Sequence, residues 1–159
     1  HIKLLATDQL YINAECKALL GEDPEPFGIN IVKVGDSIAF DGGHENGGIT
    51  AELFNVDHGP NVSAPVKENF GFLLKADGET IYFGGDIFYP SGMNVSELEV
   101  GYALIPVGGH YTFGPEEALA FAKQFKKIGK IIPMHYEIRP EAKDEFLAIA
   151  EAAGFSVGQ

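Results

Sequence analysis

Ile81-Tyr82-Phe83-Gly84-Gly85-Asp86 is a short apolar run that ends at two glycines and an aspartate. Its β-branched and aromatic residues are typical of a strand, and the glycines allow other groups to approach the backbone closely. Such a strand carries a carboxylate out of the core, where it can bind a metal ion or act as a catalytic acid. Because Gly-Gly-Asp is also an ordinary turn sequence, the other strand ends decide between the two interpretations.

Three further apolar runs end near a histidine in the same way: Ile49 to Val56 before His58, Val100 to Val107 before His110, and Lys130 to Met134 before His135. Strands that run in the same direction bring their ends to one edge of a sheet, so these side chains can converge on Asp86. His44, by contrast, lies in a glycine-rich turn and is expected to be solvated.

The remaining pattern predicts a mixed α/β domain. Asp77-Gly78 is a strong hairpin signal, and the hairpin would deliver Asp86. The run Ile49 to Val56 alternates in hydrophobicity, which predicts a strand with one buried face that leaves Phe54 on the other. Helices are expected over Ala14 to Leu20, from Gly114 onward with Lys123, Lys126, Lys127 and Lys130 at the C-terminal end, and over Pro140 to Ala153. Since no linker or repeat divides the chain, residues 1–159 form a single predicted domain.

Composition limits the class of protein. A chain of 159 residues can bury about 70% of its unfolded surface, and 45% of its residues are hydrophobic. No apolar run reaches the roughly 20 residues of a membrane helix, so we expect a soluble protein. The net charge of −12 disfavours nucleic acid as a partner. Cys16 is the single cysteine, which excludes an intrachain disulfide and favours a cytoplasmic location.

The residue types at the strand ends suit a metal ion. Imidazole nitrogen and carboxylate oxygen bind Zn²⁺ at about 2.0–2.2 Å, and a site with open positions is the catalytic kind. A mixed His and Asp set also suits manganese or iron, so the sequence leaves the metal open.

Four segments together resemble, in order and spacing, the later motifs of metallo-β-lactamase-fold hydrolases, most of all their lactonase-like metal-dependent branch: Asn55 to His58, Tyr82 to Asp86, Ile105 to Thr112, and Ile132 to Tyr136. The resemblance implies an α/β fold, the four-layer αββα sandwich of that family, N-terminally incomplete in this chain. The family's first motif, His-x-His-x-Asp-His, would lie upstream, and His1 would be its last histidine.

The resemblance also implies roles for the site residues. His58 would bind one metal ion, Asp86 would bridge two, and His1 and His135 would bind the second, with two Zn or Mn ions in the complete protein. His110 would lie near the substrate as a catalytic residue that stabilises an oxyanion or protonates a leaving group. The implied enzyme is a hydrolase that uses a metal-bound hydroxide on a small ester, lactone or phosphoester.

Two alternatives remain beside this interpretation. The chain could be a non-catalytic metal-binding fragment of a larger assembly, in which a missing N-terminal segment or a second copy of the chain covers an apolar sheet face. Alternatively, the amine and ring of His1 could chelate copper, as in histidine-brace oxidases. Those proteins usually carry disulfides and surface aromatics, whereas this chain has one cysteine and no tryptophan.

Overall fold

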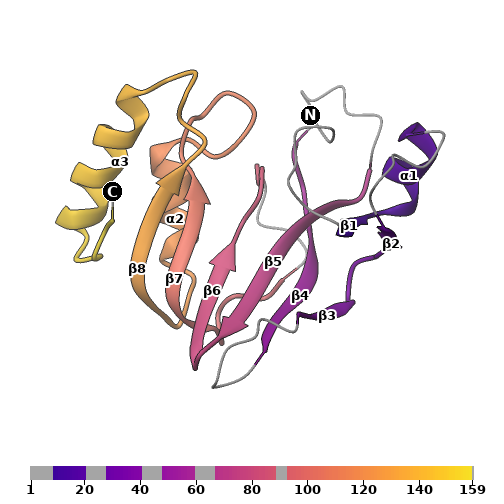
Figure 1. The fold of residues 1–159 in the computed structure, drawn as a ribbon. Helices are drawn as coiled ribbons and strands as arrows, with labels where there is room; N and C mark the ends of the chain where they lie inside the picture. The colour runs from indigo at the N-terminus through magenta and orange to yellow at the C-terminus, as the bar shows by residue number, and fades with distance from the viewer. Residues whose placement is uncertain (1–8, 21–27, 41–47, 60–66, 89–92, 159) are drawn as a thin grey trace.

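The computed structural model describes residues 9–20, 28–40, 48–59, 67–88 and 93–158. The elements in chain order are β1 (Gln9–Ile12), α1 (Ala14–Leu20), β2 (Gly28–Ile31), β3 (Ser37–Phe40), β4 (Ile49–Val56), β5 (Asn69–Ala76), β6 (Glu79–Phe83), β7 (Glu99–Pro106), α2 (Pro115–Ala122), β8 (Lys127–Met134) and α3 (Glu141–Ala152) (Figure 1). His1 and His44 lie outside the described residues. Among the described helices, none is long and apolar enough to cross a membrane.

Strand direction places four strand ends at one edge. The larger sheet has the order β3-β4-β5-β6-β7-β8, and β1 pairs with β2 separately. The pairs β3–β4, β4–β5 and β5–β6 are antiparallel, whereas the pairs β6–β7 and β7–β8 are parallel. Strand β4 therefore runs in the same direction as β6, β7 and β8. The convergence predicted from the sequence is confirmed at the level of the backbone.

The hairpin that leads to Asp86 forms as predicted. Strands β5 and β6 pair up to Ala76 and Glu79, and the two residues between them have positive φ angles, 50° at Asp77 and 79° at Gly78. These are the angles of the tight turns that match the twist of paired strands, which explains why Asp-Gly occurs there.

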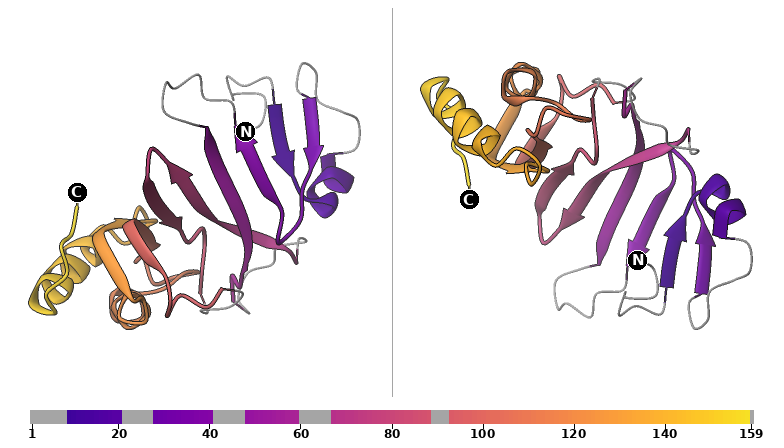
Figure 2. Two further views of the ribbon diagram at one scale, coloured as in Figure 1. Left: turned by 90° about the horizontal axis from the view of Figure 1, so that it is seen from below. Right: turned by 90° about the horizontal axis from the view of Figure 1, so that it is seen from above.

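The main core lies between one face of the larger sheet and helices α2 and α3 (Figure 2). Tyr82 on β6 is at its centre: it is 1% exposed and its ring stacks on Phe54 of β4 at 5.2 Å. The same ring contacts Phe121 of α2 at 5.8 Å and Phe125 at 5.1 Å. Burial of this size, with aromatic pairs at favourable spacing, fixes β6 against α2 and so fixes where Asp86 emerges.

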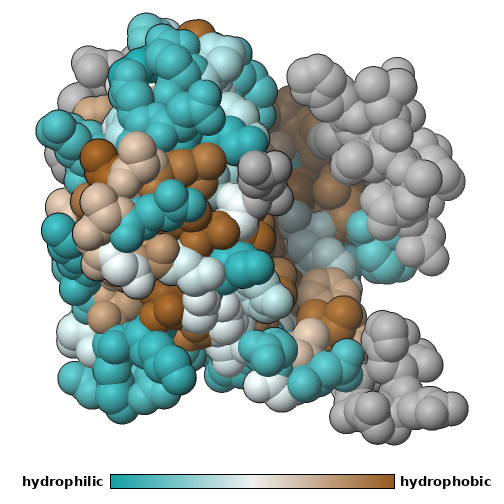
Figure 3. All heavy atoms as spheres, turned by 90° about the vertical axis from the view of Figure 1, so that its left-hand side faces the viewer, coloured by the Kyte–Doolittle hydropathy of each residue, from teal (hydrophilic) through white to brown (hydrophobic). Residues whose placement is uncertain are grey.

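A second apolar surface lies on the N-terminal side of the larger sheet. A groove of about 330 Å³ there is lined by nine residues: Tyr11, Val32, Ile38, Phe40, Ala51, Leu53, Phe70, Phe72 and Leu74. The ring of Tyr11 on β1 meets that of Phe40 on β3 at 5.5 Å. The space-filling view also shows hydrophobic residues at the back of a hollow in the surface (Figure 3).

Two sequence predictions were wrong in detail. Strand β4 is buried on both faces, because Ala51 and Leu53 line the groove while Phe54 and Val56 belong to the main core. Phe54 is 3% exposed and not on a solvated face.

The lysine-rich stretch was also misplaced in part. Helix α2 ends at Ala122, and β8 begins at Lys127, three residues before the strand predicted from Lys130, so Lys127 belongs to β8 and not to the helix terminus. Lys127 pairs with Glu99 of β7, and a Cβ at Gly129 would lie 2.6 Å from the carbonyl oxygen of Gly101. The lack of a side chain at Gly129 therefore lets β8 lie close to β7, an effect that helical periodicity cannot reveal.

Candidate metal centre

Asp86 is held at the edge of the sheet by the two glycines before it. Gly84 donates its backbone N–H to the carbonyl of Leu104 at 3.0 Å, which extends the β6–β7 pairing by one residue. Gly85 has a φ of 57°, and a Cβ there would lie 2.9 Å from the carbonyl oxygen of Phe70. Only glycine combines this backbone angle with so close an approach, so the Gly-Gly pair sets the direction in which Asp86 leaves the strand.

Two histidines flank Asp86 from different strand ends. His58 Nε2 lies 3.3 Å from Asp86 Oδ2, and His135 Nε2 lies 3.4 Å from Asp86 Oδ1. The three side chains are between 18% and 46% exposed, so the group is open to solvent and to a ligand. Each histidine therefore faces a different oxygen of the same carboxylate, which is the arrangement expected of a bridging ligand.

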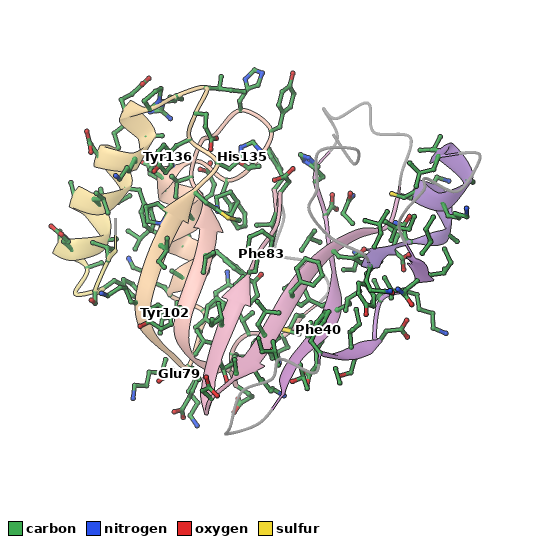
Figure 4. All side chains as sticks on the ribbon, viewed as in Figure 1. Phe40, Glu79, Phe83, Tyr102, His135 and Tyr136 are labelled. Atoms are coloured by element: carbon green, nitrogen blue, oxygen red, sulfur yellow. The ribbon has the colours of Figure 1, made fainter. Side chains whose placement is uncertain are left out.

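The backbone of His135 has a strained conformation that directs its side chain toward Asp86. His135 has a φ of 56°, in the left-handed region that few non-glycine residues adopt, at a cost of about 1–3 kcal/mol. A Cβ on Gly108, at the end of β7, would collide with the carbonyl oxygen of His135. His135 and Tyr136 lie where β8 ends, on the same side of the molecule as the end of β7 (Figure 4). The packing of two strand ends thus holds the His135 ring toward Asp86.

The second nitrogen of His58 fixes the chemical state of its ring. His58 Nδ1 lies 3.0 Å from the backbone oxygen of Tyr111, and because a carbonyl oxygen can only accept, Nδ1 carries the hydrogen. In the neutral ring, Nε2 then has a lone pair that faces the carboxylate oxygen of Asp86. Two facing lone pairs require a cation between them, either a second proton or a metal ion.

The distances fit a metal ion. A charge-assisted hydrogen bond between imidazolium and carboxylate is usually about 2.7–2.9 Å long, which is shorter than both contacts with Asp86. Two ligand atoms that each lie about 2.0–2.1 Å from a tetrahedral Zn²⁺ are separated by about 3.3–3.4 Å. The contacts of 3.3 and 3.4 Å agree with that separation. His58, Asp86 and His135 therefore have donor types and spacing that fit metal binding.

The described residues supply only part of each ligand set. Within the described ranges, no group of three or more His, Cys, Asp or Glu side chains could hold one ion by itself. Each oxygen of Asp86 is faced by one histidine, so each ion would have two ligands from this region. His1, the further ligand predicted from the sequence, lies outside the described residues, and its role stays a prediction.

His110 lies in the loop between β7 and α2 and is exposed. Its ring packs edge-on against that of Tyr111, with 4.1 Å between the ring centroids. The carbonyl that accepts the hydrogen bond from His58 also belongs to Tyr111, the residue that follows His110. In the described part of the chain, no ion pair joins His110 to Asp86, so its predicted place near the substrate remains untested.

Sequence reasoning missed two features of this region. The backbone oxygen of Tyr111 orients His58, and no sequence pattern marks it because any residue has such an oxygen. Thr112 is 2% exposed, and its hydroxyl has no hydrogen-bond partner among the described residues. A threonine after two exposed residues gives no sign in the sequence that its hydroxyl is buried.

Comparison with known proteins agrees with this geometry. The profile of the β-lactamase superfamily domain matches residues 13–135. A UPF0173 metal-dependent hydrolase from Korarchaeum cryptofilum is 33% identical over 112 residues, which cover 69% of this chain and 48% of that protein. One from Thermococcus kodakarensis is 45% identical over 73 residues, which cover 44% of this chain and 32% of that protein. The chain thus matches about half or less of the length of these curated relatives.

Solved structures show the same fold. Igni18, a metallo hydrolase from Ignicoccus hospitalis, is 25% identical with a TM-score of 0.69, and the match covers 93% of this chain and 63% of that one. The metallo-β-lactamase fold protein YhfI from Bacillus subtilis is 12% identical with a TM-score of 0.67, covering 94% of this chain and 61% of that one. The family match over residues 13–135 and these structures show that the chain belongs to the β-lactamase superfamily and has the metallo-β-lactamase fold.

Proposed function

We propose that this chain contributes Asp86, His58 and His135 to a centre of two divalent ions that hydrolyses a small ester, lactone or phosphoester. The supporting observation is the pair of contacts at Asp86, where each carboxylate oxygen faces a different imidazole nitrogen at 3.3 or 3.4 Å. Zinc and manganese both suit this set of donors. His1 is proposed as a further ligand of the ion at His135.

The residues of the chain would have separate tasks. Divalent ions at such a centre supply an activated water and polarise the oxygen of the substrate. Asp86 holds the two positions at a fixed separation and offsets their positive charge. His58 presents Nε2 because its Nδ1–H is engaged by the Tyr111 carbonyl. His135 presents Nε2 because its backbone is locked against Gly108.

We propose His110 as the residue that contacts the reacting atoms. It is exposed, it is next to the residue that orients His58, and imidazole can donate a hydrogen bond to a developing oxyanion or a proton to a leaving group. The small-molecule substrate would reach the centre from the solvent side, where Asp86 is 46% exposed.

The test compares hydrolysis by metal-depleted and reloaded protein. p-Nitrophenyl acetate, δ-valerolactone and bis-p-nitrophenyl phosphate represent the three substrate classes. We expect activity on one class that disappears on chelation, returns with Zn²⁺ or Mn²⁺, and is absent in Asp86→Asn. Asp77→Asn is the matched control, since it changes an aspartate in a turn that asparagine also favours. Activity that survives chelation, or that Asp86→Asn retains, would refute the proposal.

The second candidate is a non-catalytic metal-binding part of a larger assembly. Two observations favour it. In the described region each proposed metal position has only two protein ligands, and the chain matches 48% of the length of the relative from Korarchaeum cryptofilum. In that case the same samples would bind metal in an Asp86-dependent way and hydrolyse none of the three substrates.

With one cysteine, the protein suits the reducing cytoplasm, where we place it.

A further inference from the structure

We propose that Arg139, the only arginine in the sequence, is a positioning residue that holds the loop of residues 107–114, here called the His110 loop, beside the metal centre. Arg139 itself lies between the end of β8 and the start of α3. The inference rests on the proposed function, in which His110 contacts the reacting atoms, and it adds a residue that acts through His110 without touching the substrate.

Two carboxylates anchor the Arg139 guanidinium to helix α3. Its Nε lies 3.5 Å from Glu141 Oε1, and its Nη2 donates a hydrogen bond to Glu145 Oε2. Both glutamates belong to α3, which Phe146, with no exposed surface, fixes in the main core. The planar fork of an arginine can face two carboxylates and a third neighbour at once, which the single ammonium of a lysine cannot do in the same geometry. The guanidinium is therefore held against a well-packed helix.

The remaining nitrogen of Arg139 faces the His110 loop. A Cβ added at Gly109 would lie 3.5 Å from Arg139 Nη1, which is an ordinary van der Waals distance. Gly109 has a φ of 79° and donates its backbone N–H to the carbonyl of Phe113 at 2.9 Å, so this hydrogen bond closes the loop. The guanidinium thus lies against the point where the loop turns back on itself, one residue before His110.

The His110 loop reaches the metal centre through two backbone contacts. Phe113 donates its N–H to the carbonyl of Ile87, the residue after the shared carboxylate, at 3.0 Å. The carbonyl of Tyr111 accepts the hydrogen bond from His58. A shift of this loop would therefore move His110 relative to the centre, and a misplacement of about 1 Å can reduce a rate by about a hundredfold.

A simpler role for Arg139 would be to stabilise the start of α3 alone. Its ion pairs join side chains that are 38% to 65% exposed, and such pairs add little to global stability. In that case the loss of Arg139 would loosen the first turn of α3, where Ala142 donates its N–H to the Arg139 carbonyl at 3.0 Å. The two roles thus affect different amides: Gly109 in the His110 loop, or Ala142 in α3.

Amide hydrogen exchange in ¹⁵N-labelled, zinc-loaded protein distinguishes these roles. In Arg139→Gln, we expect Gly109 to exchange about fivefold faster or more than in the wild type, because the loop opens more often, while Ala142 changes by less than about twofold. Loss of a positive charge would by itself lower the local hydroxide concentration and slow the exchange, so a faster rate reports opening of the loop.

Lys75→Gln is the matched control for the exchange experiment. It breaks an ion pair of 2.6 Å with Glu52, whose partners are 49% and 42% exposed, so it removes one cation from a similar setting. Gly109 should exchange in this variant as it does in the wild type. Unchanged exchange of Gly109 in Arg139→Gln, or faster exchange at Ala142 alone, would overturn the proposal.

Steady-state kinetics of the zinc-loaded protein tests the link to His110. Arg139→Gln should lower kcat about tenfold, while KM and metal content stay within about twofold of the wild type. In a His110→Ala background the same substitution should have no further effect, because the two residues act as one unit. Arg139→Lys keeps the charge but has no atom in the place of Nη1, so it should resemble Arg139→Gln.

Full kcat in Arg139→Gln, or an equal loss with and without His110, would refute the action through His110. The exchange experiment needs no substrate, so it decides whether Arg139 holds the loop even if the wild type hydrolyses none of the three substrates. Failure of the proposed function is thereby kept apart from failure of this inference.

Discussion

The two ring nitrogens of His58 face two different oxygens, and this pair of contacts determines how the residue can act. Nδ1 lies 3.0 Å from the Tyr111 carbonyl and Nε2 lies 3.3 Å from Asp86 Oδ2. The carbonyl accepts the hydrogen of Nδ1 and leaves Nε2 as the nitrogen that points at the shared carboxylate and can bind a metal ion. Tyr111 therefore contributes to the site through its backbone carbonyl and not through its side chain.

The first prediction concerns this tautomer. In zinc-loaded protein, we expect the ¹⁵N shifts of His58 to show a protonated Nδ1 and a metal-bound Nε2. The measurement is a long-range ¹H–¹⁵N correlation spectrum of the protein with and without zinc. A proton on Nε2 of His58 in the loaded protein would contradict the assignment.

The second prediction concerns His110. If it contacts the reacting atoms, His110→Ala should lower kcat by about a hundredfold or more, the usual contribution of a general acid or oxyanion donor, while metal content stays at the wild-type level. Steady-state kinetics and elemental analysis of the same samples check this. Full kcat with normal metal content would exclude the role.

At the scale of elements, the strand ends explain what the sequence could predict. The hairpin at Asp77-Gly78 and the positions of Asp86, His58 and His135 after apolar runs were predictable, because turn chemistry and strand periodicity are local. The burial of Phe54 was not, because it depends on α2, which follows some 60 residues later in the chain. The left-handed backbone of His135 and the Tyr111 contact depend on close packing between strand ends, which no local pattern encodes.

The third prediction tests that packing. Gly108→Ala places a methyl group against the carbonyl oxygen of His135, so it should displace the ring from Asp86. We expect weaker metal binding and a loss of stability of about 1–3 kcal/mol, the usual cost of an added group in a tight contact. Titration with Zn²⁺ and chemical denaturation measure the two effects.

Gly158→Ala is the control for that variant. Its Cβ would first meet carbons of the flexible Lys130 and Ile132 side chains, at 3.1 and 3.4 Å, and these can move aside. It should therefore bind Zn²⁺ as the wild type does. Equal metal affinity in Gly108→Ala and Gly158→Ala would show that this contact does not position His135.

At the scale of the whole molecule, the apolar groove beside β3, β4 and β5 is the feature that calls for a partner. Its lining is made of aliphatic and aromatic side chains, and the chain matches about half or less of the length of the relatives. Apolar surface of this kind favours association, and the occupant we propose is either an upstream segment of the complete protein or a second copy of this chain.

The fourth prediction is that this chain alone self-associates through the groove. Sedimentation velocity over a hundredfold range of concentration should show dimers or larger species, and Leu74→Lys, in the groove, should reduce them. Tyr102→Lys is the control, because Tyr102 is 39% exposed and does not line the groove. A monomer at every concentration that also unfolds cooperatively would rule out the proposal.

The most direct test of the central claim is the metal content of the chain after dialysis against a small excess of Zn²⁺ or Mn²⁺ and removal of free metal. The shared contacts at Asp86 predict that wild type and Asp77→Asn retain metal, and that Asp86→Asn, His58→Ala and His135→Ala retain less. The greatest loss is expected in Asp86→Asn, because both of the proposed metal positions use that carboxylate. Equal metal content in wild type and Asp86→Asn would contradict the claim that Asp86 bridges two ions.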